Sequence, residues 1–120
     1  MKLPGPDHPI TITQNPRRVR VTVGDIVIAE TSKALTLKEA KYPAVQYVPR
    51  DDTNMALLSR TERTTHCPYK GDASYWSVLP AADAGKDAMW AYERPFDEMT
   101  EIRDHGAFYR DKVTIEATPD

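Results

Sequence analysis

Apolar and β-branched residues alternate with polar ones over several short stretches of the chain, which is typical of strands with one buried face. The clearest example is the pair of stretches 18–23 and 26–31, which flank Gly24 and Asp25. Because glycine and aspartate favour the tight turns that join antiparallel strands, this spacing predicts a β-hairpin.

The same pattern continues along the rest of the chain. Strands are predicted over residues 10–13, 44–48, 73–78, 88–92 and 113–117. Residues 57–60 and 62–65 form either two short strands or one bent strand, residues 32–40 fit a strand or a helix, and residues 79–86 are expected to be a loop. Asp51, Asp52 and Thr53 are expected to cap one helical turn over residues 54–57.

One helix is predicted near the C-terminus, beginning at Pro95. Phe96, Met99 and Ile102 lie three residues apart and so share one face, and Gly106 ends the segment. The sequence therefore predicts a mainly β fold, a compact single domain of short antiparallel strands with one short C-terminal helix. We expect this domain to span residues 10–120, after a flexible N-terminal arm at residues 1–9.

Composition narrows the classes of function open to such a domain. The 120 residues are 40% hydrophobic and 28% charged, as in ordinary folded domains, and ten prolines favour strands and turns over helices. The formal net charge of −2 argues against nucleic-acid binding, because basic surfaces bind phosphate backbones. No apolar run approaches the length of a membrane span and no signal pattern opens the chain, so we expect a cytoplasmic protein without membrane contact.

The sequence lacks the common motifs for phosphate, nucleotide and metal chemistry. Its five glycines form neither a phosphate-binding loop nor a dinucleotide fingerprint. One cysteine and three scattered histidines do not supply the paired ligands of a zinc site, so no metal is predicted. Candidate chemistry is therefore confined to one turn and to the aromatic residues.

The turn Cys67-Pro68-Tyr69-Lys70 carries the candidate catalytic residues, Cys67 and Lys70. In a tight turn the ammonium of Lys70 can approach the sulfur of Cys67, and a nearby cation favours the nucleophilic thiolate. His66 is a candidate base beside them. The alternative is a buried, inert cysteine in a structural turn, since free cysteine is among the most buried residue types.

Aromatic residues on neighbouring strands form a second candidate group. Tyr47, Tyr75, Trp90 and Tyr92 fall on predicted strands, where Trp90 and Tyr92 share one face. Together with Tyr69 they could line a ligand pocket that offers polar hydroxyl and indole N–H groups. The alternative is ordinary core packing.

Four other residues are assigned structural roles. Phe108 and Tyr109 are expected to anchor the helix on the sheet. His8 is expected to be a solvated residue of the arm, and His105 to cap the C-terminus of the helix.

Several of these stretches together are similar to a known family. Residues 67–77, Cys-Pro-Tyr-Lys-Gly-Asp-Ala-Ser-Tyr-Trp-Ser, resemble the signature of the family labelled domain of unknown function 427. Residues 47–50, Tyr-Val-Pro-Arg, and residues 90–95, Trp-Ala-Tyr-Glu-Arg-Pro, resemble further parts of it, as do Phe108 and Tyr109 before a strand. The resemblance covers nearly the whole chain from residue 10, and its motif at 47–50 adds Arg50 to the candidate ligand-binding residues.

The resemblance implies a β-rich fold similar to the β-tent of B-type methionine sulfoxide reductases and zinc-binding exchange factors. Proteins of that fold commonly hold zinc through paired Cys-x-x-Cys motifs, which this chain does not contain. The family is sometimes labelled nucleotidyltransferase-like, but the sequence has neither the glycine-serine motif nor the paired aspartates that nucleotidyl transfer needs.

The sequence supports three hypotheses about function. The first is a small-molecule-binding protein or enzyme, with Lys70 as an anion anchor or Cys67 as a nucleophile in a pocket with the aromatic residues. The second is a non-catalytic interaction domain in which the same turn is structural. A thiol redox sensor is the third, but Cys67 has no resolving cysteine in the chain.

Overall fold

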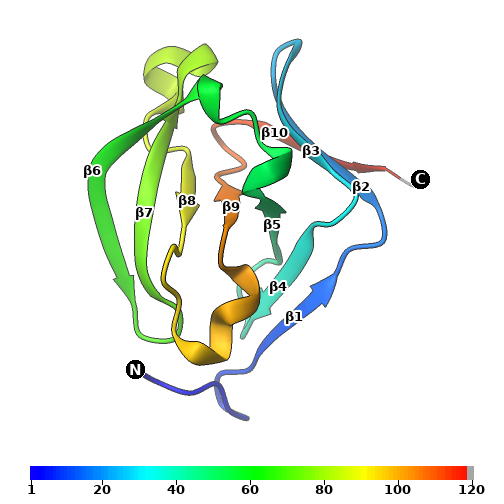
Figure 1. The fold of residues 1–120 in the computed structure, drawn as a ribbon. Helices are drawn as coiled ribbons and strands as arrows, with labels where there is room; N and C mark the ends of the chain where they lie inside the picture. Colours follow the sequence, from blue (N-terminus) through cyan, green and yellow to red (C-terminus); the bar gives the residue numbers. More distant parts are fainter. Residues whose placement is uncertain (119–120) are drawn as a thin grey trace.

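The computed structural model describes residues 1–118, which form ten strands and four short 3₁₀ helices (Figure 1). Every strand pair is antiparallel. The strands are β1 Ile10–Gln14, β2 Arg18–Val23, β3 Ile26–Thr31, β4 Leu35–Glu39, β5 Val45–Pro49, β6 Leu58–Cys67, β7 Gly71–Val78, β8 Met89–Ala91, β9 His105–Phe108 and β10 Thr114–Thr118. The 3₁₀ helices are η1 Arg50–Asp52, η2 Met55–Leu57, η3 Leu79–Gly85 and η4 Asp97–Ile102. The prediction of a mainly β, antiparallel fold is confirmed.

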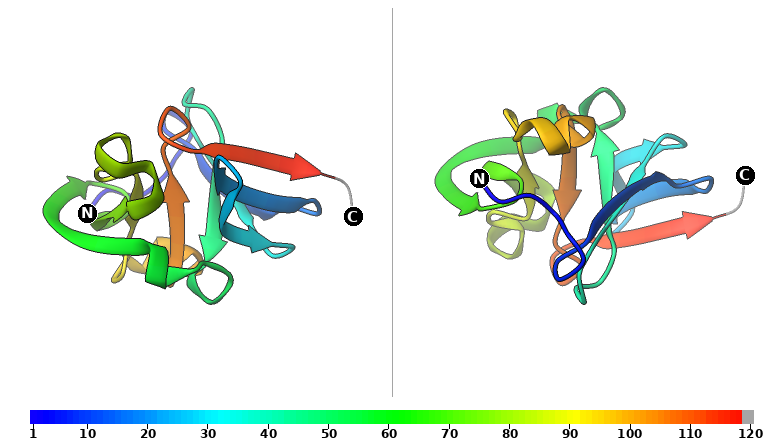
Figure 2. Two further views of the ribbon diagram at one scale, coloured as in Figure 1. Left: turned by 90° about the horizontal axis from the view of Figure 1, so that it is seen from above. Right: turned by 90° about the horizontal axis from the view of Figure 1, so that it is seen from below.

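The strands form two sheets. The large sheet has seven strands in the order β1-β4-β5-β9-β8-β7-β6, and the small sheet has three in the order β10-β2-β3. The small sheet lies beside the β5 region of the large one, and β3 approaches β5 directly (Figure 2). The N-terminal arm crosses the lower end of the large sheet, where the Lys2 N–H donates to the Pro68 carbonyl at 2.7 Å.

The strand predictions agree with the structure. The predicted hairpin is β2 and β3 around Gly24 and Asp25. Residues 58–65 belong to one strand, β6, whose pairing with β7 shifts register between Arg60 and Thr64, so the strand is bent, and residue 57 ends η2. The ambiguous stretch 32–40 contains strand β4.

The helix predictions need correction, because the described part of the chain contains no α-helix. The helix expected from Pro95 is the 3₁₀ helix η4, interrupted at Met99, and the chain enters strand β9 at His105 instead of ending a helix there. The three-residue spacing of Phe96, Met99 and Ile102 fits a 3₁₀ helix equally well, since residues i and i+3 share a face in both. The expected loop at 79–86 contains a 3₁₀ helix as well.

The helical turn after Asp51 and Asp52 is also capped differently from the prediction. Both aspartates lie inside η1, and the side chain of Asn54 caps η2 by accepting the Ala56 N–H at 3.3 Å. Asparagine is as good a cap as aspartate, and it stands one residue before the helix, where a cap acts.

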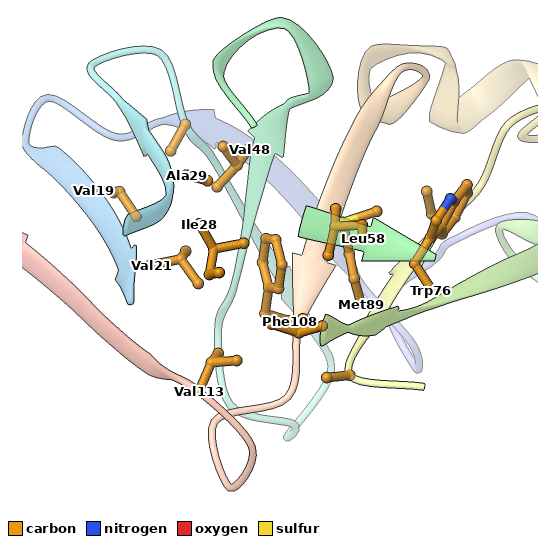
Figure 3. Close-up of a cluster of buried hydrophobic side chains, with 14 residues drawn as sticks. Val19, Val21, Ile28, Ala29, Val48, Leu58, Trp76, Met89, Phe108 and Val113 are labelled. Carbon is orange, nitrogen blue, oxygen red and sulfur yellow. The ribbon is translucent and has the colours of Figure 1, made fainter. Parts of the chain in front are cut away.

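Two hydrophobic clusters lie on opposite faces of the large sheet. The inter-sheet core fills the space between the two sheets and contains Val19, Val21 and Ile28 of the small sheet with Val48, Trp76, Met89 and Phe108 of the large one (Figure 3). Neighbouring strand residues face the other way and contribute Leu37, Tyr47, Ala73, Tyr75 and Ala107 to the pocket-side core. Tyr92, just after β8, and Met99 and Ile102 of η4 complete this cluster. Strand alternation thus places apolar residues between the sheets and most of the tyrosines on the far face.

Candidate functional site

A pocket of about 650 Å³ opens on the pocket-side face of the large sheet. Its walls come from the β4–β5 loop, the β6–β7 turn, β8 and the end of β9. The pocket therefore reaches from the β4 side of the large sheet to its β6–β7 side. All six tyrosines of the chain line this one pocket, at positions 42, 47, 69, 75, 92 and 109. Trp90, Cys67, Lys70, His8 and Glu39 line it too.

The β6–β7 turn is a three-residue connection of Pro68, Tyr69 and Lys70, closed by the pairing of Cys67 with Gly71. Gly71 has a φ of 113°, a backbone conformation that side chains rarely adopt and glycine tolerates. The backbone N–H of Phe96 donates to the Lys70 carbonyl at 3.0 Å. The turn is therefore held from both sides, by the N-terminal arm and by the segment before η4.

Lys70 extends from this turn into a buried ion pair with Glu39. The two side chains are only 9% and 15% exposed, and the ammonium also lies 5.9 Å from the centre of the Tyr92 ring. His8 contacts the second carboxylate oxygen of Glu39 through Nε2 at 2.8 Å. Burial opposes ionisation of Glu39, but the hydrogen bonds to Lys70 and His8 outweigh it and hold the pKa of Glu39 below its usual value.

Trp90 forms the aromatic centre of the pocket. Its ring meets Tyr47 edge-on, with centroids 6.5 Å apart, and lies tilted against Tyr109 at 4.6 Å. The indole Nε1–H donates to the Tyr47 hydroxyl at 3.4 Å. At the arm side of the pocket, His8 stacks flat on Tyr69, with centroids 4.1 Å apart.

The hydroxyls of Tyr47, Tyr92 and Tyr109 give the pocket polar groups that stay neutral over the physiological pH range. Burial raises the pKa of Tyr47 and of Tyr92 far above the usual tyrosine value. Burial, with a hydrogen bond to Tyr75, raises the pKa of Tyr109 to about 12. Tyr75 also shares a hydrogen bond of 2.9 Å with the Thr65 hydroxyl. The phenols of Tyr47, Tyr92 and Tyr109 therefore act as hydrogen-bonding groups and not as charges.

Most of the predicted site residues meet in this pocket. Its lining includes every candidate except Arg50: Tyr47, Cys67, Tyr69, Lys70, Tyr75, Trp90 and Tyr92. Arg50 lies outside it, paired with Glu93 at 3.2 Å and with its guanidinium 5.1 Å from the centre of the Trp76 ring. Trp76 belongs to the inter-sheet core, so Arg50 is on the side away from the pocket.

The groups expected to activate Cys67 are engaged elsewhere. The ammonium of Lys70 contacts Glu39, and within residues 1–118 no contact joins it to the sulfur of Cys67. His66 bonds the Asp72 carboxylate through Nδ1 at 2.7 Å on an exposed edge. Cys67 itself is half-buried in the pocket wall. The catalytic roles of Cys67 and Lys70 remain predictions.

Sequence reasoning missed three members of the site. Tyr109 was expected to anchor a helix, but its ring packs at a tilt against Trp90 in the pocket. His8 was expected to be solvated but is held between Tyr69 and Glu39. Glu39 had a usable signal, because it follows Leu35 and Leu37 at two-residue spacing and so shares their inward face. No sequence pattern near His8 indicates that it belongs to the site, because its position depends on the N-terminal arm folding back across the sheet.

Features typical of metal-binding and membrane-spanning proteins are absent from the described part of the chain. Among residues 1–118, no three metal-binding side chains gather closely enough to hold an ion, and no helix has the length and apolar character that crossing a bilayer requires.

A search of curated proteins gives no match to the chain. A family model described as domain of unknown function DUF427 matches residues 11–118. Since the match covers almost the whole chain, this protein belongs to the DUF427 family.

Proposed function

We propose that this domain binds a small, flat organic molecule in the tyrosine-lined pocket. The observation that carries the proposal is the convergence of all six tyrosines, spread over positions 42 to 109, on one cavity. A volume of about 650 Å³ is within the usual range for small-molecule sites.

The choice of tyrosine over phenylalanine supports binding over simple packing. The chain has six tyrosines and only two phenylalanines, so its aromatic side chains mostly bring a hydroxyl with them. A hydroxyl in a core must find a hydrogen-bond partner and adds nothing to hydrophobic burial. A pocket that needs both ring faces and hydrogen-bonding groups, in contrast, is best built from tyrosine and tryptophan.

The ring arrangement supports a flat ligand. Two pairs of aromatic rings, Trp90 with Tyr109 and His8 with Tyr69, line the same cavity. Aromatic rings prefer offset-stacked or edge-to-face neighbours, which a planar ligand can supply. The buried ion pair of Lys70 with Glu39 contributes polarity at one end without leaving a free charge.

The alternative is a non-catalytic interaction domain in which the turn is structural. The two backbone hydrogen bonds that clamp the turn, to Lys2 and Phe96, favour a structural role for it. They do not account for the tyrosines, since only Tyr69 belongs to the turn. The two hypotheses differ in whether the pocket takes up a small molecule.

The test is a titration of the ¹⁵N-labelled protein with benzamide at millimolar concentration, followed by NMR. Trp90 lines the pocket and Trp76 lies in the inter-sheet core, so the two indole N–H signals serve as probe and internal control. Binding in the pocket shifts the Trp90 signal with saturation and leaves the Trp76 signal in place. If neither benzamide nor toluene shifts the Trp90 signal, the pocket does not bind flat small molecules and the proposal fails.

A further inference from the structure

We propose that the buried end of the pocket recognises a neutral hydrogen-bond acceptor, such as the carbonyl oxygen of an amide, lactam or ketone, through the hydroxyls of Tyr92 and Tyr47. This inference rests on the proposed function and names the chemical class of its ligand. It depends on which polar groups of the pocket are already used by the protein and which are left over.

Tyr92 supplies the first unused group. The residue is only 6% exposed, yet among the described residues no group shares a hydrogen bond with its hydroxyl. In the same part of the chain, no fully buried side-chain oxygen or nitrogen lacks a partner. The Tyr92 oxygen therefore retains access to the pocket that its side chain lines. A nearly buried hydroxyl left without a protein partner is costly unless a molecule in the pocket satisfies it.

Tyr47 supplies the second. Its hydroxyl oxygen accepts the indole N–H of Trp90 at 3.4 Å, and no acceptor for its own proton is found within residues 1–118. The indole bond leaves the Tyr47 hydroxyl as a donor. Because burial raises the pKa of both Tyr47 and Tyr92, both protons stay in place at neutral pH. The pocket thus offers two spare O–H donors.

The charges of the pocket select a neutral acceptor over an anion. Among residues 1–118, Lys70 is the buried lysine or arginine that lines the pocket, but its charge is matched by Glu39, which also accepts from His8. A carboxylate at the buried end would meet no free positive charge and would lie near the Glu39 carboxylate, and burying an unpaired charge is expensive. Arg110, exposed on the lining, is too close to solvent to offset that cost.

A ligand cation is disfavoured for the related reason that Glu39 is already engaged. Its two carboxylate oxygens contact Lys70 and His8, so an ammonium would have to displace one of them. Purely apolar ligands would fill the ring-lined space but leave the Tyr92 hydroxyl unsatisfied. A flat molecule with one carbonyl satisfies both the ring faces and the spare donors.

Four probes built on one phenyl ring separate these classes: benzamide with a neutral carbonyl, benzoate with an anion, benzylamine with a cation, and toluene with no polar group. Each is titrated into the ¹⁵N-labelled protein at pH 7, and affinity is taken from the Trp90 indole shift. We expect benzamide to bind about 3- to 10-fold more tightly than toluene, which is the gain from one or two net hydrogen bonds. Benzoate and benzylamine should bind more weakly than benzamide.

The variant Tyr92→Phe tests the assignment of the donor. It removes one oxygen that has no protein partner, so the fold should tolerate it, and a two-dimensional NMR spectrum checks this directly. Its affinity for benzamide should fall by about 3- to 10-fold while its affinity for toluene stays unchanged. Tyr47→Phe should act in the same direction, with an added loss because the indole N–H of Trp90 also loses its acceptor.

The outcomes separate this inference from the proposed function. If toluene binds as tightly as benzamide, or if Tyr92→Phe leaves benzamide affinity unchanged, the pocket binds flat molecules without recognising the carbonyl group. This inference is then overturned. Tightest binding of benzoate or benzylamine would overturn it as well. If no probe shifts the Trp90 signal, the proposed function fails together with it.

Discussion

The buried ion pair between Lys70 and Glu39 leads to a quantitative prediction about stability. Replacing Lys70 with methionine keeps the length of the side chain and removes its charge. The Glu39 carboxylate, only 15% exposed, is then left with His8 as its one remaining partner. Breaking a buried ion pair on one side costs about 3–5 kcal/mol. Because both side chains retain some contact with solvent, we expect about 3 kcal/mol, at the lower end of that range.

The pH dependence of this loss has a definite sign. The pKa of Glu39 is lowered in the folded protein relative to its usual 4.5, so its ionisation stabilises the fold above that pH. The contribution is lost as the pH falls through the lower folded pKa. In Lys70→Met this contribution is missing, so the variant and the original protein should differ most at pH 7 and converge below pH 4.5.

Urea unfolding at a series of pH values, followed by fluorescence, measures these differences. Lys41→Met is the matched control, because Lys41 is exposed on the neighbouring loop, and we expect it to change stability by less than about 0.5 kcal/mol. Glu39→Gln should cost about 2 kcal/mol, and the double variant no more than Lys70→Met alone, which gives a coupling of about 2 kcal/mol. If the two single losses add, or if Lys70→Met costs less than about 1 kcal/mol, the ion pair does not support the fold as argued here.

Three further predictions test the turn, the tyrosines and the thiol. Gly71→Ala should lower the free energy of unfolding by about 1–3 kcal/mol, because alanine is strained at a φ of 113°, and unchanged urea midpoints would refute this. Since Tyr47, Tyr92 and Tyr109 have raised pKa values, the folded protein retains protons that the unfolded chain releases, so stability should fall as the pH rises above 10. Ultraviolet absorbance should then show some tyrosines ionising only on unfolding. Iodoacetamide should modify Cys67 in the native protein, and benzamide should slow the reaction, as read by mass spectrometry; no protection would place the thiol away from the bound probe.

The strands were predictable because one face of each is buried. In β2, Val19 and Val21 face the inter-sheet core and alternate with exposed arginines, and this two-residue period is visible in the sequence. The sequence could not show whether the segment after Pro95 forms an α-helix or a 3₁₀ helix. The spacing of Phe96, Met99 and Ile102 describes a shared face, and a shared face at intervals of three fits both helix types.

The pocket could be predicted in part. Trp90 and Tyr92 lie two residues apart on an extended segment, so their common face follows from strand geometry, and both line the pocket. Arg50 was included through the family motif at residues 47–50, but it begins η1 and pairs with Glu93 instead. His8 depends on contacts between residues more than thirty positions apart, which no local pattern reports.

The contacts of Lys70 could not be read from the sequence either. Spacing within the turn suggested the sulfur of Cys67 as its neighbour, three residues away. The structure sends its side chain across to Glu39 on β4, because the curved sheet brings the β6–β7 turn and the end of β4 to the same pocket. A buried ammonium takes the nearest carboxylate as its partner.

The central claim is that the pocket receives a flat carbonyl compound between its tyrosines. Intermolecular nuclear Overhauser effects between bound benzamide and the protein test it most directly. The account predicts contacts from the benzamide ring to Trp90 and Tyr109, with the amide end near Tyr92. Contacts confined to surfaces outside the pocket, or an amide end directed to solvent with the ring toward Tyr92, would contradict it.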